Sequence, residues 1–182
     1  MWVILGVVAV ILVWAVVVYN GLVQLRVRAD GAWSDIGVQL KRRYDLIPNI
    51  VEAVKGYAAH EQKVFVQVTE ARSRAMQASS PKGKEVAEGM LTGALKSLFA
   101  VAENYPQLRA NENFMGLQRS LTEVEEALQG ARRYYNAVVR DYNTKTSVFP
   151  DRVVAQAGGF TVKEFFQLDS SEEAKAPKVS FS

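Results

Sequence analysis

The sequence predicts an all-α protein, with a single N-terminal transmembrane helix followed by an antiparallel bundle of long helices. Three observations lead to this prediction. The first nineteen residues, Met1 to Tyr19, contain no charged side chain. After them, large apolar residues recur at steps of three and four, the spacing of one helix face. No alternating strand pattern of useful length interrupts these stripes.

The uncharged run has the length of a membrane helix. At about 1.5 Å per residue it spans roughly 28 Å, close to the hydrocarbon thickness of a bilayer. Its valines and isoleucines would favour a strand in water, but a lone strand in lipid leaves its backbone unpaired, so a helix is expected. Trp2, Trp14 and Tyr19 supply aromatic anchors. We therefore assign residues 1–21 to a transmembrane anchor.

A cleaved signal peptide is the alternative interpretation of this run. Signal peptides have a basic region before the apolar part and a small-x-small cleavage site after it. Neither is present, so we expect the anchor to be retained. Arg26 and Arg28 follow the run closely, with Asp30 offsetting them in part. By the positive-inside rule, these two membrane-proximal arginines favour a cytoplasmic location for the bulk of the chain.

A first helical stripe follows the anchor directly. It consists of Leu22, Leu25, Ala29, Trp33, Ile36, Leu40, Ile47, Val51, Val54 and Ala58. Pro48 lacks a backbone donor, so a kink or a break with a tight restart is expected between residues 46 and 49. The stripe keeps its phase across the proline, and a further helical stretch is expected to reach about Ala78. Residues 79–83 have the composition of a turn.

Two more helices complete the predicted bundle, which covers residues 22–150. One runs from about Gly83 to Glu103, where Asn104-Tyr105-Pro106 ends it. The last helix is expected to be capped by Asn111 or Asn113 and to end before Pro150. Its stripe consists of Phe114, Leu117, Leu121, Val124, Leu128, Ala131, Tyr135, Val138 and Tyr142.

The C-terminal region divides into two parts by composition. Residues 151–168 are expected to be irregular, with Phe160, Phe165 and Phe166 docking on the bundle or on a partner. Residues 169–182 are polar and cannot bury enough apolar surface to order themselves, so a disordered tail is expected.

Composition excludes several classes of function. The absence of cysteine excludes disulfides, thiolate metal sites and a lipoprotein anchor. The net charge of +3 comes from residues 20–78, which hold nine basic and six acidic side chains. This weak excess suits anionic lipid headgroups, but it is too small to indicate nucleic-acid binding.

No catalytic or metal-binding constellation is evident in the sequence. His60 is the only histidine, and positions 56 and 64, one helical turn away, hold Gly and Val. A helical zinc site needs a second ligand at that spacing. The glycines do not form a phosphate-binding loop, and Glu123, Glu125 and Glu126 lie among arginines as on a solvated helix face. We expect no enzyme activity, no cofactor and no metal.

Candidate interaction residues remain. Lys41-Arg42-Arg43 is the densest basic cluster, and it suits phosphate groups or an acidic partner; a polar helix face is the favoured interpretation. Asp45 lies in the polar run before Pro48, where Asp45 or Asn49 could satisfy the backbone group that the proline frees. The candidate set is Lys41, Arg42, Arg43, Asp45, Phe160, Phe165 and Phe166, with Arg26 and Arg28 near the membrane.

Several blocks in this order resemble the LemA family. They are Tyr19-Asn20-Gly21-Leu22-Val23-Gln24-Leu25-Arg26, Ala32-Trp33-Ser34-Asp35-Ile36, the run from Val38 to Asn49, Val54-Lys55-Gly56-Tyr57-Ala58, Asn104-Tyr105-Pro106, the run from Asn111 to Gln118, Tyr134-Tyr135-Asn136, Tyr142-Asn143 and Phe149-Pro150. The resemblance implies a single-pass protein of the bacterial cell membrane with a helical-bundle domain. It transfers no catalytic residue. Relatives are associated with magnetosome membranes and with membrane proteases.

These features favour a membrane-anchored scaffold or adaptor. Its expected partners are itself, as a homo-oligomer, and the lipid bilayer; another membrane protein, such as a protease, is a further candidate. Two rival hypotheses remain. One is a lipid-organising protein that uses Arg26, Arg28 and the aromatic segment. The other is an enzyme, or a regulatory subunit of one, that uses His60 with carboxylates of the bundle.

Overall fold

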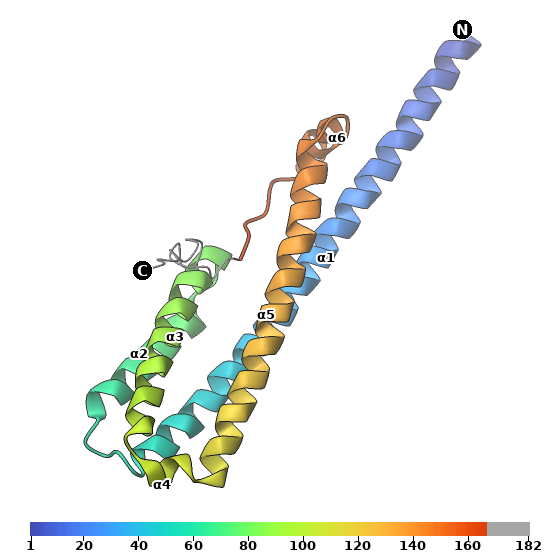
Figure 1. The fold of residues 1–182 in the computed structure, drawn as a ribbon. Coiled ribbons are helices and arrows are strands. Elements are labelled where there is room, and N and C mark those ends of the chain that lie inside the picture. Colours follow the sequence, from blue (N-terminus) through green and yellow to red (C-terminus); the bar gives the residue numbers. More distant parts are fainter. Residues whose placement is uncertain (167–182) are drawn as a thin grey trace, which may run out of the picture. The chain divides into compact units, whose positions relative to one another are not determined.

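The computed structural model describes residues 1–166, and over this range it contains helices and no strand (Figure 1). This confirms the all-α prediction and the helical bundle. The helices are α1 (Trp2–Lys55), α2 (Gln62–Gln77), α3 (Pro81–Glu103), α4 (Pro106–Arg109), α5 (Glu112–Ser147) and α6 (Asp151–Ala157). They form two compact units. The first holds residues 1–43 and 120–165, and the second holds residues 44–119 and Phe166.

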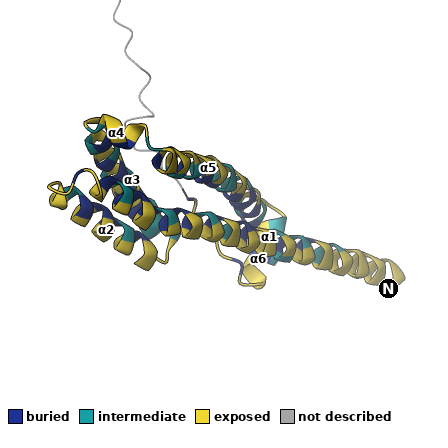
Figure 2. Cartoon of the chain, turned by 90° about the horizontal axis from the view of Figure 1, so that it is seen from below, coloured by how far each residue is buried: buried dark blue, intermediate teal, exposed yellow. Residues whose placement is uncertain are grey.

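The N-terminal part of α1 is the most exposed apolar surface of the described chain. Nearly all of its first seventeen residues are exposed, and Trp2 is 82% accessible (Figure 2). The helix is long and apolar enough to cross a membrane. A core helix would instead bury such residues, so lipid is the solvent that suits this surface.

In the first unit α1 and α5 pack antiparallel. Leu22 shares a buried cluster with Tyr142. Further along α1, the Trp33 ring lies 5.3 Å from the Tyr135 ring, and Arg43 Nε lies 2.7 Å from Glu125 Oε1. As the residue number rises along α1, the number of the contacting residue on α5 therefore falls. This is the antiparallel packing that two long apolar stripes predict.

In the second unit α2 and α3 form a helical hairpin. The Ser80 hydroxyl accepts a hydrogen bond from the Gly83 amide at 3.0 Å, and Pro81 occupies the first turn of α3. Such a cap stabilises a helix start. Residues 79–83, expected to be a turn, therefore include the first turn of α3. Asn111 caps α5, because its Oδ1 accepts from the Phe114 amide at 3.1 Å.

The structure corrects two predicted elements. The helix expected to reach Ala78 ends at Lys55, and α2 begins only at Gln62. Ala58, the last residue of the predicted stripe, is buried in the connection, so the apolar pattern continues past the end of α1 at the poor helix former Gly56. The short helix α6 lies where irregular chain was expected, and a second short helix, α4, lies between the two long helices predicted before and after it. Four and seven residues are too few to show a helical period.

Pro48 lies inside α1 without breaking it. Proline cannot donate to the carbonyl of residue 44, four positions earlier. In the structure Arg72 Nε donates to the Tyr44 carbonyl oxygen at 2.8 Å. A side chain of α2 thus supplies the missing donor, a role that the sequence suggested for Asp45 or Asn49.

This arrangement predicts coupling between Arg72 and Pro48. Arg72→Met should destabilise the protein by about 1–3 kcal/mol, because it leaves the Tyr44 carbonyl without its donor. Pro48→Ala restores a backbone N–H at the right position, so Arg72→Met should cost clearly less in that background. Denaturant unfolding of the four variants in detergent gives the coupling free energy. Equal costs in both backgrounds would contradict the assignment.

Candidate interaction site: a C-terminal strap on the first unit

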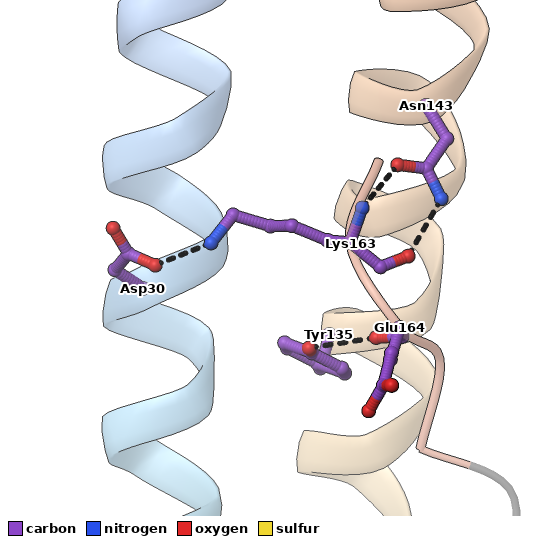
Figure 3. A network of polar contacts seen from close by, with 5 residues as sticks. All are labelled: Asp30, Tyr135, Asn143, Lys163 and Glu164. Carbon is purple, nitrogen blue, oxygen red and sulfur yellow. Dashed lines mark hydrogen bonds and ion pairs between the residues drawn. The ribbon is translucent and has the colours of Figure 1, made fainter. Parts of the chain in front are cut away.

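Residues 158–165, which we term the strap, lie along the first unit after α6 (Figure 3). A glycine pair starts the strap. Gly159 has a φ of +68°, a conformation that L side chains rarely adopt. A Cβ on Gly158 would lie 2.7 Å from the Phe160 ring. Both glycines are therefore needed where the chain reverses.

Asn143 holds the strap through its side-chain amide. Its Nδ2 donates to the Lys163 carbonyl at 2.9 Å, and its Oδ1 accepts from the Lys163 amide at 2.8 Å. The Tyr135 hydroxyl donates to the Glu164 carbonyl at 2.9 Å. Lys163 Nζ also reaches Asp30 of α1 at 2.7 Å. Side chains of α5 therefore satisfy backbone groups of a segment that has no regular secondary structure, and Asp30 of α1 pairs with the lysine side chain of this segment (Figure 3).

Phe160 connects the strap to the end of the apolar run. Its ring is 8% exposed and belongs to the buried cluster of Val18, Leu22, Tyr142 and Ala155. The Tyr19 ring meets it edge-on at 5.4 Å between centroids. Arg26 places its guanidinium carbon 5.4 Å from the centre of the same ring, which allows a cation–π contact.

The tyrosines beneath the strap hold their protons more tightly than usual. Burial raises the pKa of Tyr135 above the ordinary 10.0, and the negative charges of Asp30 and Glu164 raise this pKa further. Burial also raises the pKa of Tyr142, where the charge of Arg26 opposes the increase. The Tyr135 hydroxyl therefore remains a hydrogen-bond donor throughout the neutral range.

The structure separates the predicted basic cluster. Lys41 and Arg42 are exposed, and Arg42 Nη1 donates to Gln39 Oε1 at 3.4 Å. Arg43 is 1% exposed and pairs with Glu125. This corrects the expectation of one exposed patch, because Arg43, one of its three residues, is buried and paired. Glu125, which was expected on a solvated helix face, lies instead at the interface between α1 and α5.

The other candidate residues fall into two groups. Asp45, Arg26 and Arg28 are exposed. Phe160 and Phe166 are buried, whereas Phe165 is 39% exposed. Phe160 is therefore occupied by contacts within its own chain, and Phe165 is the aromatic residue of the three that remains accessible.

A buried polar group of the second unit escaped the sequence reasoning. Glu88 of α3 is fully buried, and its carboxyl oxygen accepts a hydrogen bond from the Tyr44 hydroxyl. The Ala75 carbonyl lies 3.2 Å from both the Tyr44 hydroxyl and Lys84 Nζ. Since the lysine can satisfy that carbonyl, the single phenolic proton can serve Glu88. The only sequence signal was an acid on an otherwise apolar face.

Within the described residues no group of three or more His, Cys, Asp or Glu side chains could hold a metal ion. His60 is exposed in the connection between α1 and α2. The groove between α2 and α3 contains one acid, Glu70, which lies 3.8 Å from Arg74 in the same groove.

The strap contacts predict unequal costs of substitution. Asn143→Ala should cost about 1–3 kcal/mol, since it removes both hydrogen bonds to the Lys163 backbone. Asp30→Asn removes an ion pair whose acid is 62% exposed, so it should cost less than about 1 kcal/mol. Hydrogen exchange should accelerate over residues 161–166 in Asn143→Ala far more than in Asp30→Asn. The reverse order would contradict the role given to Asn143.

The pKa of Tyr135 predicts a loss of stability at high pH. A raised pKa in the folded state means that the folded protein holds the proton more tightly than the unfolded chain does. The stabilisation is therefore complete below about pH 10, the unfolded pKa, and is lost as the pH rises through the folded-state pKa. Melting temperatures measured from pH 9 upward should fall less steeply for Tyr135→Phe than for the unaltered protein. Parallel curves would contradict the prediction.

Comparison with known proteins places this fold in a family. The model of the LemA family matches residues 32–181. Magnetosome protein MamQ 2 of Paramagnetospirillum magneticum is 26% identical over 175 residues, which cover 82% of this chain and 64% of the relative. MamQ of Magnetospirillum gryphiswaldense is 24% identical over 174 residues, covering 81% and 64%. Protein LemA of Metamycoplasma hominis is 25% identical over 141 residues, covering 75% and 63%.

The chain thus spans less than two thirds of the length of these relatives. The family model, by contrast, covers well over half of this chain, from α1 through the strap. The chain therefore belongs to the LemA family.

Proposed function

We propose that this protein is a membrane-anchored scaffold or adaptor that presents helical surfaces at a set distance from the bilayer. The observation that supports this most directly is that the membrane segment and the first core helix are one helix. Val18, within the apolar run, and Leu22, just after it, are buried with Tyr142 and Phe160. No flexible linker lies between the anchor and the packed unit.

This continuity has a mechanical consequence. A flexible linker would let a domain wander over a distance that grows with linker length. A helix instead fixes height, because each residue adds about 1.5 Å along its axis. Surfaces on the first unit are thereby held at defined levels above the membrane, as a scaffold requires.

The relatives support work at a membrane. Two of them are named magnetosome proteins. We infer that this chain likewise serves a membrane-bound assembly. The arginines Arg26 and Arg28 support a cytoplasmic location for the bulk of the chain.

Self-association is part of the proposal. Val27, Gly31, Ser34 and Val38 are all exposed and follow one another on α1 at steps of four, three and four. This places them on one face, where small side chains permit a second copy of the helix to approach closely. Anchoring confines the copies to two dimensions and raises their effective concentration, so a weak contact can suffice.

Single-cysteine crosslinking tests this face, because the chain has no cysteine of its own. At Gly31 an added Cβ meets no atom within 4 Å, and the same holds for the control position Gly116 on α5. In native membranes Gly31→Cys should form disulfide-linked dimers well above the level of Gly116→Cys. Equal crosslinking at both positions would indicate random collision.

Native mass spectrometry of the full chain in nanodiscs tests the wider proposal. We expect an oligomer, or a monomer with a co-purifying membrane protein. A strict monomer with no recoverable partner would contradict a scaffold or adaptor.

A further inference from the structure

The corner between α5 and α6 exposes an apolar cluster that its own unit leaves uncovered. We define this corner as residues 148–153. Val148 is 54% exposed, Phe149 79% and Val153 57%. They lie within about one turn of each other, since the Val153 amide donates to the Pro150 carbonyl and the Arg152 amide to the Val148 carbonyl. Single exposed apolar residues are ordinary, but three together call for an explanation.

The packing of α6 fixes where this corner lies along α1. Ala155 of α6 is buried in the cluster that contains Val18 and Leu22 of α1. Val154 and Trp14 are partly buried against the same cluster. The helix α6 and this N-terminal part of α1 both belong to the first unit. Figures 1 and 2 show them side by side. The corner therefore lies at the level of Trp14 to Leu22.

That level is the exit side of the bilayer. A hydrocarbon core of about 30 Å takes up roughly twenty helical residues, so a span that begins at Trp2 ends near Gly21. Arg26, the first charged side chain of α1, then lies about 8 Å further on, among the headgroups. Trp14 to Leu22 occupy the last part of the hydrocarbon and its boundary, and α6 is packed against them.

We propose that the corner is a second membrane contact, in which Val148, Phe149 and Val153 insert into the lipid beside α1. An aromatic and two aliphatic side chains suit the boundary between acyl chains and headgroups. The proposal rests on α1 crossing the bilayer.

The charges around the corner are compatible with this site. Asp151, the acid within the corner, is neutralised by Lys145 at 2.8 Å. Arg152 is exposed next to Val153, where a long side chain can extend its charge to the headgroups. Asp141, an exposed acid of α5, lies two helical turns before Val148.

Depth measurement by spin labelling tests the proposal on the full chain. Phe149→Cys and Val153→Cys are each labelled with a nitroxide and reconstituted in phosphatidylcholine vesicles that contain phosphatidylglycerol. Collision with oxygen, which enriches in lipid, is compared with collision with a water-soluble nickel chelate. Val16→Cys is the lipid control. Gly37→Cys is the aqueous control, because Gly37 is exposed on the same helix and an added Cβ there meets no atom within 4 Å.

We expect the oxygen-to-nickel ratio at Phe149→Cys to resemble that of Val16→Cys and to exceed that of Gly37→Cys several-fold. Val153→Cys should follow the same order. A ratio at Phe149→Cys equal to that of Gly37→Cys overturns the proposal. A label at Phe149→Cys shielded from both reagents also overturns it, in favour of contact with protein. An aqueous value at Val16→Cys would instead refute the anchor itself, so the two failures are distinguishable.

Discussion

The helix α1 runs unbroken from the apolar run to Lys55, and each of the two units is built on a part of it. Pro48 opposes this, because it withholds a hydrogen bond and leaves the Tyr44 carbonyl unsatisfied. A buried carbonyl without a partner costs free energy comparable to a lost hydrogen bond. Arg72 of α2 removes this cost, because its Nε donates a hydrogen bond to the Tyr44 carbonyl oxygen at 2.8 Å. The long helix is thus stabilised by a tertiary contact as well as by its own backbone hydrogen bonds.

Buried charged groups give the packing its specificity. Arg43 and Glu125 join α1 to α5 in the first unit, and Glu88 meets Tyr44 in the second. Buried ionic groups repay their desolvation only when their partners are well placed. Arg43 and Glu88 are themselves buried, so loss of Glu125 or of Tyr44 would remove a contact that offsets the cost of their burial. These contacts therefore select one register of helix against helix, where apolar stripes alone tolerate sliding by a turn.

The sequence predicted those features that repeat along the chain. Steps of three and four from Phe114 to Tyr142 identified the helix that the structure shows as α5, and Asn111 indicated its start. The break at residues 56–61 was missed, because Ala58 stays buried and in phase there. The helix α6 was missed because it is too short to show a period.

The candidate site was less predictable for a different reason. Arg43 and Glu125 look like surface charges until a second helix is placed beside them. Asn143 is one of many polar residues on α5. Its side chain nevertheless holds the strap, by bonding the backbone of Lys163 twenty positions later. Pairings of this kind depend on distance in space, and no local pattern encodes them. Phe160 could be recognised as apolar, but not as part of the cluster with Val18.

The overlap of anchor and core affects how the protein can be studied in water. A fragment that begins after residue 21 loses Val18 and Tyr19, so Phe160 loses two of the groups that cover it. Such a fragment would expose apolar surface where the intact chain has none, and its aggregation or low melting temperature would reflect the truncation. Replacing the outward-facing residues of the apolar run with polar ones, while keeping Trp14 and Val18, preserves the covered face. The altered protein would then be soluble while the packing of the first unit is kept.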